Sequence, residues 1–478
     1  MLRSSEIDLK SLTITKAHEA LVNKEYRAED LVQAYRDKIS AENPELNAYL
    51  GVFDSALEEA RVVDRKLAAG QEIGLLEGLP MAIKDNILIK GRVASAASKM
   101  LENYTASYDA TVIEKLKKAG VSFLGRTNMD EFAMGGSTEN SAFGPTKNPH
   151  DKARVAGGSS GGSASVVGGD LALFALGSDT GGSIRQPSSF CGVVGLKPTY
   201  GAVSRYGVMA MASSLDQIGP IAKTVADAEI LFNCLKGKDP LDSTSQDSPE
   251  KPVGWKQKMK LGVPRSFLSE GLDPEVKKNF DEVARKFVDI GYELVDVDLS
   301  LLKYALSVYY VLMPAEVSAN LARFDGMRYG SHAEGTNLLG DYEKTRGQFF
   351  GPEARRRIML GTYVLSAGYY DAYYGKATEV RRLIRAAYDK VFEQVDAVIT
   401  PTAPSPAFLI GEKTDNPLQM YLEDIYTVPV NLAGVPAISV PCGKTEGGLP
   451  LGLQITAPHF REDILFDLGK KVENLSKL

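Results

Sequence analysis

Three short segments of the chain carry residues that could do nucleophilic chemistry. The first is an apolar run, residues 79–83, which ends at Lys84. A lysine buried at the end of a strand loses solvation, so its pKa falls and it can act as a general base. Taken alone, the segment is more simply explained by a strand-end lysine that reaches water, because lysine is rarely fully buried.

The other two segments are rich in glycine and serine. Gly157-Gly-Ser159-Ser-Gly161 fits the GxSxG pattern of a nucleophile elbow, although a flexible loop has a similar composition. In the segment 177–183, Ser183 follows two glycines. Successive backbone N–H groups can converge there on one point, as an oxyanion hole requires. An ordinary glycine turn before a helix is the alternative.

The histidines bear on which base could serve these serines. There are four, His18, His150, His332 and His459. A Ser-His-Asp enzyme of hydrolase order that used Ser159 would need His332 or His459, and both lie in contexts typical of surface loops. A lysine base is therefore favoured, and an esterase with Ser159 as nucleophile is the alternative.

Bulk properties narrow the class of protein. The 478 residues are 44% hydrophobic and 24% charged, with a net charge of -6. This composition is ordinary for a soluble globular protein, and the acidic excess argues against a main nucleic-acid-binding surface. The three cysteines are far apart, which predicts a reducing cytoplasm and no disulfide framework or zinc site. We expect no signal peptide and no membrane span.

Other residues receive structural interpretations. Asp179 and Arg185 flank Ser183 and are expected to pair and hold its loop. Cys191 is expected to be a small buried side chain rather than a nucleophile. The closest approach to a phosphate loop ends in Gly443-Lys-Thr but has Ile438 where a glycine is required, so no ATP site is predicted.

The elements that must position these residues alternate between helix and strand, which predicts an α/β fold. We expect an N-terminal helical segment over 1–70 that is broken at Asn43-Pro44, a buried helix of small residues over 166–175 and long helices over 303–330 and 353–395. Residues 240–257 are polar and predict a surface connection. Buried strands are expected at 79–84, 121–124, 293–297, 397–401, 437–441 and 451–455, and another opens at 260.

The glycine-serine segments 157–163 and 177–187, followed by 190–199, resemble the signature of the amidase-signature family. The resemblance covers nearly the whole chain and is densest over 78–200, the expected catalytic region. It implies a single domain, 1–478, built on a large mixed twisted β-sheet covered on both faces by helices. In that family, residues 303–395 would form a helical region for substrate or partner contact.

The resemblance also implies a role for each residue. Ser183 would be the nucleophile, Ser159 a bridging serine that follows a cis peptide bond, and Lys84 the base. The oxyanion would be held by backbone N–H groups of Thr180, Gly181, Gly182 and Ser183.

Within the family, segments 130–134, 136–149 and 427–436 are similar to those of the A subunits of bacterial glutamyl-tRNA(Gln) or aspartyl-tRNA(Asn) amidotransferases. Glutamine is the implied substrate, with Arg357 and Asp424 binding its α-carboxylate and α-ammonium and Tyr309 as a weaker candidate. Arg355 to Arg357 lie on one predicted helix, where about 100° separates neighbours, so one of them should face the pocket.

The same resemblance implies partners. The B and C subunits would complete a heterotrimer, ATP and Mg would bind the partner, and aminoacyl-tRNA would be held mainly by the B subunit. This chain would need no cofactor or metal and would supply ammonia for a tRNA that carries glutamate, aspartate or both. A free-standing amidase for another small amide is the main alternative, and an inactive interaction subunit is disfavoured by the intact Lys84, Ser159 and Ser183.

Overall fold

The computed structural model describes residues 2–247, 249, 259–268 and 271–476. Eleven strands in this part of the chain form one sheet, in the order β1-β3-β2-β4-β6-β5-β10-β11-β9-β7-β8. The strands are β1 (Tyr49–Val52), β2 (Pro80–Lys84), β3 (Ser122–Thr127), β4 (Phe174–Asp179), β5 (Val194–Lys197), β6 (Gln217–Ala222), β7 (Lys260–Val263), β8 (Glu293–Asp296), β9 (Ala397–Pro401), β10 (Ala437–Lys444) and β11 (Pro450–Thr456).

The sheet is mixed, as expected. β2 runs parallel to both β3 and β4, and β7 runs parallel to β8 and β9, while the remaining neighbours are antiparallel. Parallel strands end at the same edge of a sheet. Because Ile83 pairs with Leu176, the lysine that ends β2 and the loop that follows β4 meet at one edge.

Helices cover both faces of this sheet. α15 packs against α7 and α8 in one layer, and α5 and α6 pack together in the other. The helices are α1 (Ile14–Val22), α2 (Ala28–Leu46), α3 (Ser55–Ala68), α4 (Thr111–Lys118), α5 (Gly161–Gly168), α6 (Arg185–Phe190), α7 (Val225–Leu235), α8 (Pro274–Asp289), α9 (Ala305–Asn320), α10 (Leu338–Phe349), α11 (Pro352–Leu365), α12 (Lys376–Phe392), α13 (Pro417–Leu422), α14 (Val428–Ala433) and α15 (Glu462–Leu475). Every residue of β2, β4 and β6 is buried, as expected for strands covered on both faces.

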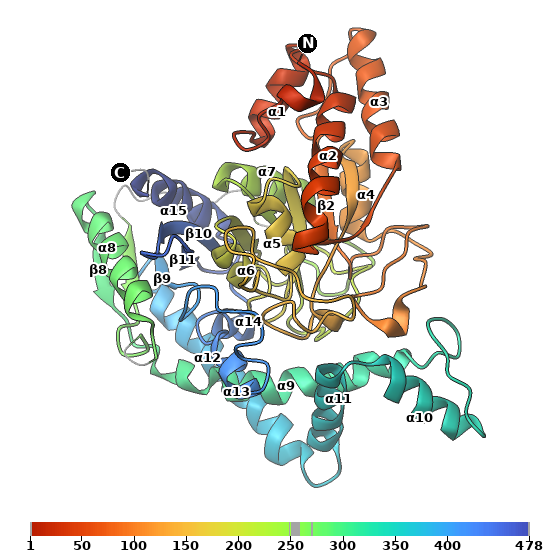
Figure 1. Ribbon diagram of the computed structural model, residues 1–478. Helices are drawn as coiled ribbons and strands as arrows, with labels where there is room; N and C mark the ends of the chain where they lie inside the picture. The colour runs from red at the N-terminus through yellow and green to blue at the C-terminus, as the bar shows by residue number, and fades with distance from the viewer. Residues whose placement is uncertain (1, 248, 250–258, 269–270, 477–478) are drawn as a thin grey trace.

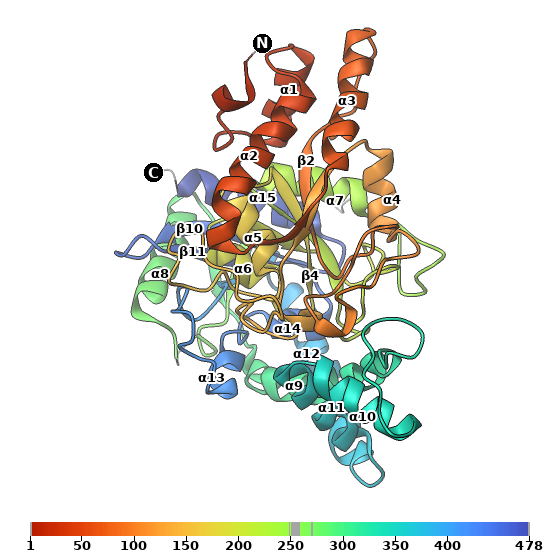
Figure 2. The ribbon, with the colours of Figure 1, turned by 45° about the vertical axis from the view of Figure 1, so that its right-hand side comes forward.

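Two groups of helices extend from opposite ends of the layered body. Figures 1 and 2 show α1, α2 and α3 at the top and α9 to α12 at the bottom, with the sheet between them. α9 packs against both α11 and α12, and α14 packs against α9 and α12 while its Asn431 bonds to Asp179 at the end of β4. The lower group therefore borders the edge at which β2 and β4 end.

Several sequence-based expectations for the N-terminal half are wrong in detail. The segment 1–70 is not wholly helical, because β1 pairs with β3 along the edge of the sheet. Pro44 does not break α2, which continues to Leu46. A proline in the last turn removes little helical bonding, and the Asn43 side chain accepts the N–H groups of Ala48 and Tyr49 at 2.9 and 2.7 Å.

The expected helix over 166–175 is also wrong. Helix α5 starts earlier, at Gly161, and ends at Gly168, and the chain then reverses through Asp170 at φ 60°. The apolar residues from Phe174 onward join β6 as strand β4. A short apolar run suits either element, and here sheet pairing decides.

The two expected long helices, over 303–330 and 353–395, are interrupted. α9 ends at Asn320, so 303–330 is not one helix. Between α11 and α12 the chain turns at Gly368, which has a φ of 87°.

Of the surface connection expected over 240–257, residues 248 and 250–257 lie outside the described residues. Within 240–247 the side chain of Asp242 is buried against Arg205. No helix in the described ranges is long and apolar enough to cross a bilayer.

Candidate active site

Lys84 occupies the last position of β2 and is completely buried. Its Nζ donates hydrogen bonds to Ser159 Oγ and Ser160 Oγ, both at 2.8 Å, and to the carbonyl oxygen of Ser178 at 3.2 Å. No carboxylate among the described residues lies within ion-pair distance of this amine, since its partners are two hydroxyls and a carbonyl. The amine of Lys84 is thus surrounded by uncharged hydrogen-bond acceptors.

Burial is the main reason that the pKa of Lys84 is lowered to about 7. The carboxylates of Asp130, Asp179 and Asp216 act in the opposite direction but do not restore the ordinary value. This agrees with the lowered pKa expected from the sequence. Near neutral pH a substantial fraction of Lys84 is therefore unprotonated and able to accept a proton.

Ser159 is buried and follows a cis peptide bond from Gly158, which confirms that expectation. The loop is tightly enclosed at this point: a Cβ on Gly158 would lie 2.1 Å from Oδ2 of Asp130. Asp130 itself accepts the backbone N–H groups of Thr138 and Asn140 at 2.9 and 3.1 Å. These contacts fix the backbone on which Ser159 meets Lys84.

Ser183 lies on the loop between β4 and α6 and retains 8% of its exposure, whereas Ser159 retains none. The carbonyl oxygen of Ser183 accepts the backbone N–H of Ser160 at 3.1 Å, which ties the two serine segments together. The loop needs glycine at Gly182, where φ is 141° and a Cβ would lie 2.3 Å from Oγ1 of Thr427. Ser183 is therefore the more accessible of the two serines.

A buried ion pair holds the Ser183 loop, as the sequence predicted. Arg185 Nε donates to Asp179 Oδ2 at 3.0 Å and its terminal nitrogen to Oδ1 at 2.9 Å, and both side chains are fully buried. Burial works against ionisation of Asp179, but the adjacent guanidinium keeps the pKa of its carboxyl below the ordinary value. Asn431 of α14 bonds to both partners.

The same carboxylate changes the set of expected oxyanion donors. The backbone N–H of Gly182 donates to Asp179 Oδ1 at 2.9 Å, so that donor is already committed to a carboxylate. The donors left for an oxyanion are the N–H groups of Thr180, Gly181 and Ser183. Tyr309 encloses this loop from α9, since a Cβ on Gly181 would lie 2.8 Å from its hydroxyl.

Of the three consecutive arginines on α11, only Arg357 is buried. Its Nε donates to Glu353 Oε1 at 2.8 Å, and its guanidinium lies 5.7 and 5.8 Å from the ring centroids of Tyr310 and Tyr421. Burial by itself would lower the pKa of Arg357, but Glu353 and the tyrosines raise it above the ordinary value. Arg355 and Arg356 are exposed.

Asp424 follows α13 and is partly buried. No side-chain partner for its carboxylate is found among the described residues, and burial raises its pKa well above the ordinary value despite the positive charge of Arg357 nearby. Its backbone carbonyl accepts the N–H of Thr427 at 3.1 Å, and Thr427 Oγ1 donates to the Gly181 carbonyl at 2.7 Å. Asp424 therefore lies close to the Ser183 loop, and its carboxylate has no partner among the described residues.

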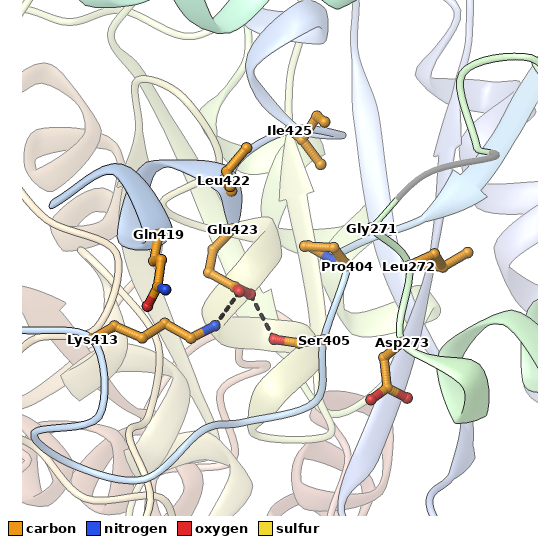
Figure 3. Close-up of a pocket in the computed structure, with 10 residues that line it drawn as sticks. All are labelled: Gly271, Leu272, Asp273, Pro404, Ser405, Lys413, Gln419, Leu422, Glu423 and Ile425. Carbon is orange, nitrogen blue, oxygen red and sulfur yellow. Dashed lines mark hydrogen bonds and ion pairs between the residues drawn. The ribbon is translucent and has the colours of Figure 1, made fainter. Parts of the chain in front are cut away.

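An ion pair behind Asp424 holds this segment in place. Lys413 pairs with Glu423, which also accepts a hydrogen bond from Ser405 Oγ at 2.7 Å. Figure 3 shows the three side chains meeting at the wall of a cavity of about 680 Å³. Lys413 also lines a smaller cavity beside Arg357 and Tyr421, so it lies between the two spaces.

In the part of the chain that the structure describes, no group of three His, Cys, Asp or Glu side chains is placed to hold a metal ion. Neither late histidine approaches Ser159. His459 instead lines a cavity beside α12, and His332 lies in the loop before α10. Among the described residues, the basic group that hydrogen-bonds to Ser159 is therefore the amine of Lys84.

Comparison with known proteins agrees with this geometry. The family model described as Amidase matches residues 30–466. The chain belongs to the amidase family. Among curated relatives, the A subunit of the glutamyl-tRNA(Gln) amidotransferase from Desulfatibacillum aliphaticivorans is 53% identical, with 96% of each chain covered. The corresponding protein of Thermosynechococcus vestitus is 52% identical, and the match covers 96% of this chain and 97% of that one.

Solved structures place this amidase-family chain in the same group. The A subunit of the Thermotoga maritima glutamyl-tRNA(Gln) amidotransferase has a TM-score of 0.81 and 42% identity over 98% of this chain and 95% of its own. A structure described only as an amidase has a TM-score of 0.83 and 29% identity over 97% and 99% of the two chains. The expected amidase-signature fold is confirmed.

Sequence reasoning missed some members of the site. Ser160 shares the Lys84 amine with Ser159, and Tyr310 and Tyr421 stack at 3.9 Å beside Arg357. Ser160 lies in the same glycine-serine run, but the run does not reveal which hydroxyl faces the lysine. The tyrosines come from α9 and α13, which are far apart in the chain, so nothing in the local pattern of residues could have paired them.

Proposed function

We propose that this chain is the glutaminase subunit of a tRNA-dependent amidotransferase, which hydrolyses glutamine and passes the ammonia to a partner that amidates Glu-tRNA(Gln), Asp-tRNA(Asn) or both. The observation that carries the proposal is the buried hydrogen bond from Lys84 to Ser159, beside the more accessible Ser183 on a glycine loop. The names of the 53% and 52% identical relatives favour glutamine over another amide.

In the proposed reaction, neutral Lys84 accepts a proton from Ser159 as Ser159 accepts one from Ser183. The Oγ of Ser183 then attacks the side-chain amide carbon of glutamine, and backbone N–H groups of Thr180, Gly181 and Ser183 hold the oxyanion. The proton returns through the same relay to the leaving nitrogen, and ammonia departs. Water hydrolyses the glutamyl ester, which releases glutamate and restores the Ser183 hydroxyl.

Recognition of the amino-acid end would use opposite charges. Arg357 would hold the α-carboxylate of glutamine, and Asp424 would hold the α-ammonium. The raised pKa of Asp424 reflects burial without a bound cation, and an ammonium would supply that cation. Tyr309 would form the wall between this end and the nucleophile loop.

The remaining functions belong, in this proposal, to partners. The B and C subunits would assemble with this chain in the cytoplasm, aminoacyl-tRNA would bind mainly through the B subunit, and ATP and Mg would bind the partner subunit. Residues 303–395 would serve both substrate and partners in a single domain over 1–478. Their exposed apolar side chains support partner contact. We call the exposed group around the tyrosines the aromatic cluster, which consists of Met359, Leu360, Tyr363, Leu365, Tyr369, Tyr370 and Tyr373.

A covalent label tests the nucleophile. A glutamine-analogue electrophile should form an adduct on Ser183, located by mass spectrometry of proteolytic fragments, and Ser183→Ala should abolish labelling. An adduct on Ser159 would support the esterase alternative and contradict this mechanism.

Nitrogen-donor exchange tests the larger function. The complex assembled with Ser183→Ala should fail to convert misacylated tRNA with glutamine but should still do so with added ammonium salt, because ammonia can reach the partner from solvent. The change removes one oxygen, so assembly should survive. Loss of both activities in an assembled complex, or full amidation by this chain alone, would overturn the proposal.

A further inference from the structure

A second cavity, of about 610 Å³, lies beside α12 at the far end of α14. It is lined by Tyr200, Ser214, Gln246, Thr378, Arg381, Arg382, Arg385, Leu432, Ala433, Gly434, His459 and Phe460. None of these residues belongs to the candidate active site. The cavity is therefore a separate feature of the molecule, although α14 lines it through Leu432 and Ala433 and also bonds to Asp179 through Asn431.

The described lining contains three arginines and no aspartate or glutamate. Arg381 and Arg385 are four residues apart, so they project from the same face of α12. Arg385 makes no ion pair with any carboxylate in the described ranges. Arg382 pairs with Glu379 at 3.2 Å, but both side chains are largely exposed, so this pair neutralises little of the charge.

The bonds of Arg381 are made to neutral groups. Its Nε donates to the Leu432 carbonyl at 3.1 Å, and its terminal nitrogens donate to Ser214 Oγ at 2.7 Å and to the Ser214 carbonyl at 2.8 Å. Burial without a contacting carboxylate lowers the pKa of Arg381, even though Glu316 acts in the other direction. The guanidinium is fixed in position without a carboxylate in direct contact, and Glu316 reaches it through Ser214.

We infer that this arginine cavity is a binding site for a phosphate-bearing ligand. A carboxylate presents two oxygens in one plane, whereas a phosphate presents its oxygens in a tetrahedral array that guanidinium groups from successive helical turns can share. The cavity is also larger than a carboxylate needs, and Tyr200 and Phe460 provide a partly apolar wall for the remainder of the ligand. Inorganic phosphate, a nucleotide and an RNA backbone share this chemistry.

Arg385→Gln is the most informative variant, because the side chain is exposed and makes no ion pair within the described chain. Arg285→Gln is the matched control, since Arg285 is an exposed arginine on α8 that does not line the cavity. Titration calorimetry on the full chain would use inorganic phosphate, a nucleoside monophosphate and a short single-stranded RNA, at matched ionic strength. Thermal unfolding would confirm that both variants fold.

We expect saturable binding of at least one probe by the wild type and by Arg285→Gln, and affinity at least about tenfold lower in Arg385→Gln, since one charge-assisted contact is lost. Binding of RNA alone would assign the phosphate to a nucleic-acid backbone, and binding of the small probes would assign it to a free ligand. No saturable binding, or equal affinity of the two variants, would overturn the inference. Glutamine hydrolysis is not the readout, so either result leaves the proposed function to its own tests.

Discussion

At the scale of single residues, burial alone does not identify a catalytic base. Lys84 and Lys197 are both fully buried, and burial is the main reason that the pKa of each is lowered to about 7. Their contacts differ, because Lys84 donates to two serine hydroxyls, whereas Lys197 donates to the Pro198 carbonyl at 2.9 Å. The lysine that can accept a proton from a serine hydroxyl is the one that contacts serine hydroxyl groups.

The pH dependence of glutamine hydrolysis should report this lysine. Only neutral Lys84 can accept a proton, and its pKa is about 7, so kcat/KM should rise as the pH increases through about 7 and then level off. The measurement is a pH-rate profile with saturating partner subunits. The same rise should persist in Lys197→Met. Loss of the rise in that variant would show that Lys197, not Lys84, is the titrating group.

Replacing Lys84 by arginine separates charge from basicity. Arginine keeps the positive charge but does not deprotonate near neutral pH, so Lys84→Arg should lower kcat for glutamine hydrolysis by about 10²–10⁴-fold. Near-normal turnover in a folded Lys84→Arg protein would rule out general-base catalysis by this residue. Tryptic resistance and the thermal midpoint serve to check folding.

At the scale of elements, the segment from Lys413 to Asp424 forms a strap beside Arg357, the residue proposed to bind the substrate carboxylate. The Lys413–Glu423 ion pair joins its two ends to each other, and Glu423 also accepts a hydrogen bond from Ser405, as Figure 3 shows. Near the C-terminal end, on α13, the Tyr421 hydroxyl donates to Glu353 Oε1 at 3.0 Å and ties the segment to α11. Asp424 follows directly, so the position of its carboxylate depends on both attachments.

Loosening the strap should therefore affect binding more than chemistry. Lys413→Met removes the ion pair and leaves Glu423 buried without its cation, so KM for glutamine should rise about tenfold while kcat changes little. Lys413→Arg keeps the charge and should restore most of the affinity. A fall in kcat at unchanged KM would mean that the strap does not position the substrate-binding carboxylate.

At the scale of the whole molecule, the lower group of helices presents apolar side chains to solvent. The aromatic cluster lies on α11 and the turn into α12, and Met359 within it is 73% exposed. Exposed apolar groups at this density are typical of surfaces that contact other proteins. The cluster is remote from the N-terminal helices, which Figure 2 shows at the other end of the molecule.

A charge placed in the cluster should weaken assembly without unfolding the chain. Met359→Glu changes an exposed side chain, so the thermal midpoint of the isolated chain should shift little, while co-purification with the B and C subunits should decrease by at least about tenfold. Val22→Glu on α1 is the matched control, because Val22 is 48% exposed at the opposite end. Equal assembly of the two variants would place the partner surface elsewhere.

The sequence alone determined the parts of this protein that depend on local chemistry. Lys84 at the end of an apolar run, the glycine-serine segments and the pairing of Asp179 with Arg185 could be inferred because each depends on residues a few positions apart. The same holds for strands such as β2 and β9, whose apolar residues and flanking turns define them. The roles of Lys84, Ser159 and Ser183 remain predictions that the geometry supports.

Only the tertiary structure decided what depends on distant contacts. It turned 174–179 into a strand because β6 is available to pair with it, and it committed the Gly182 N–H to Asp179. It also selected Arg357 from three adjacent arginines, since the packing of α11 against α9 buries that one face. Such outcomes follow from long-range packing and burial, which a local pattern of residues does not contain.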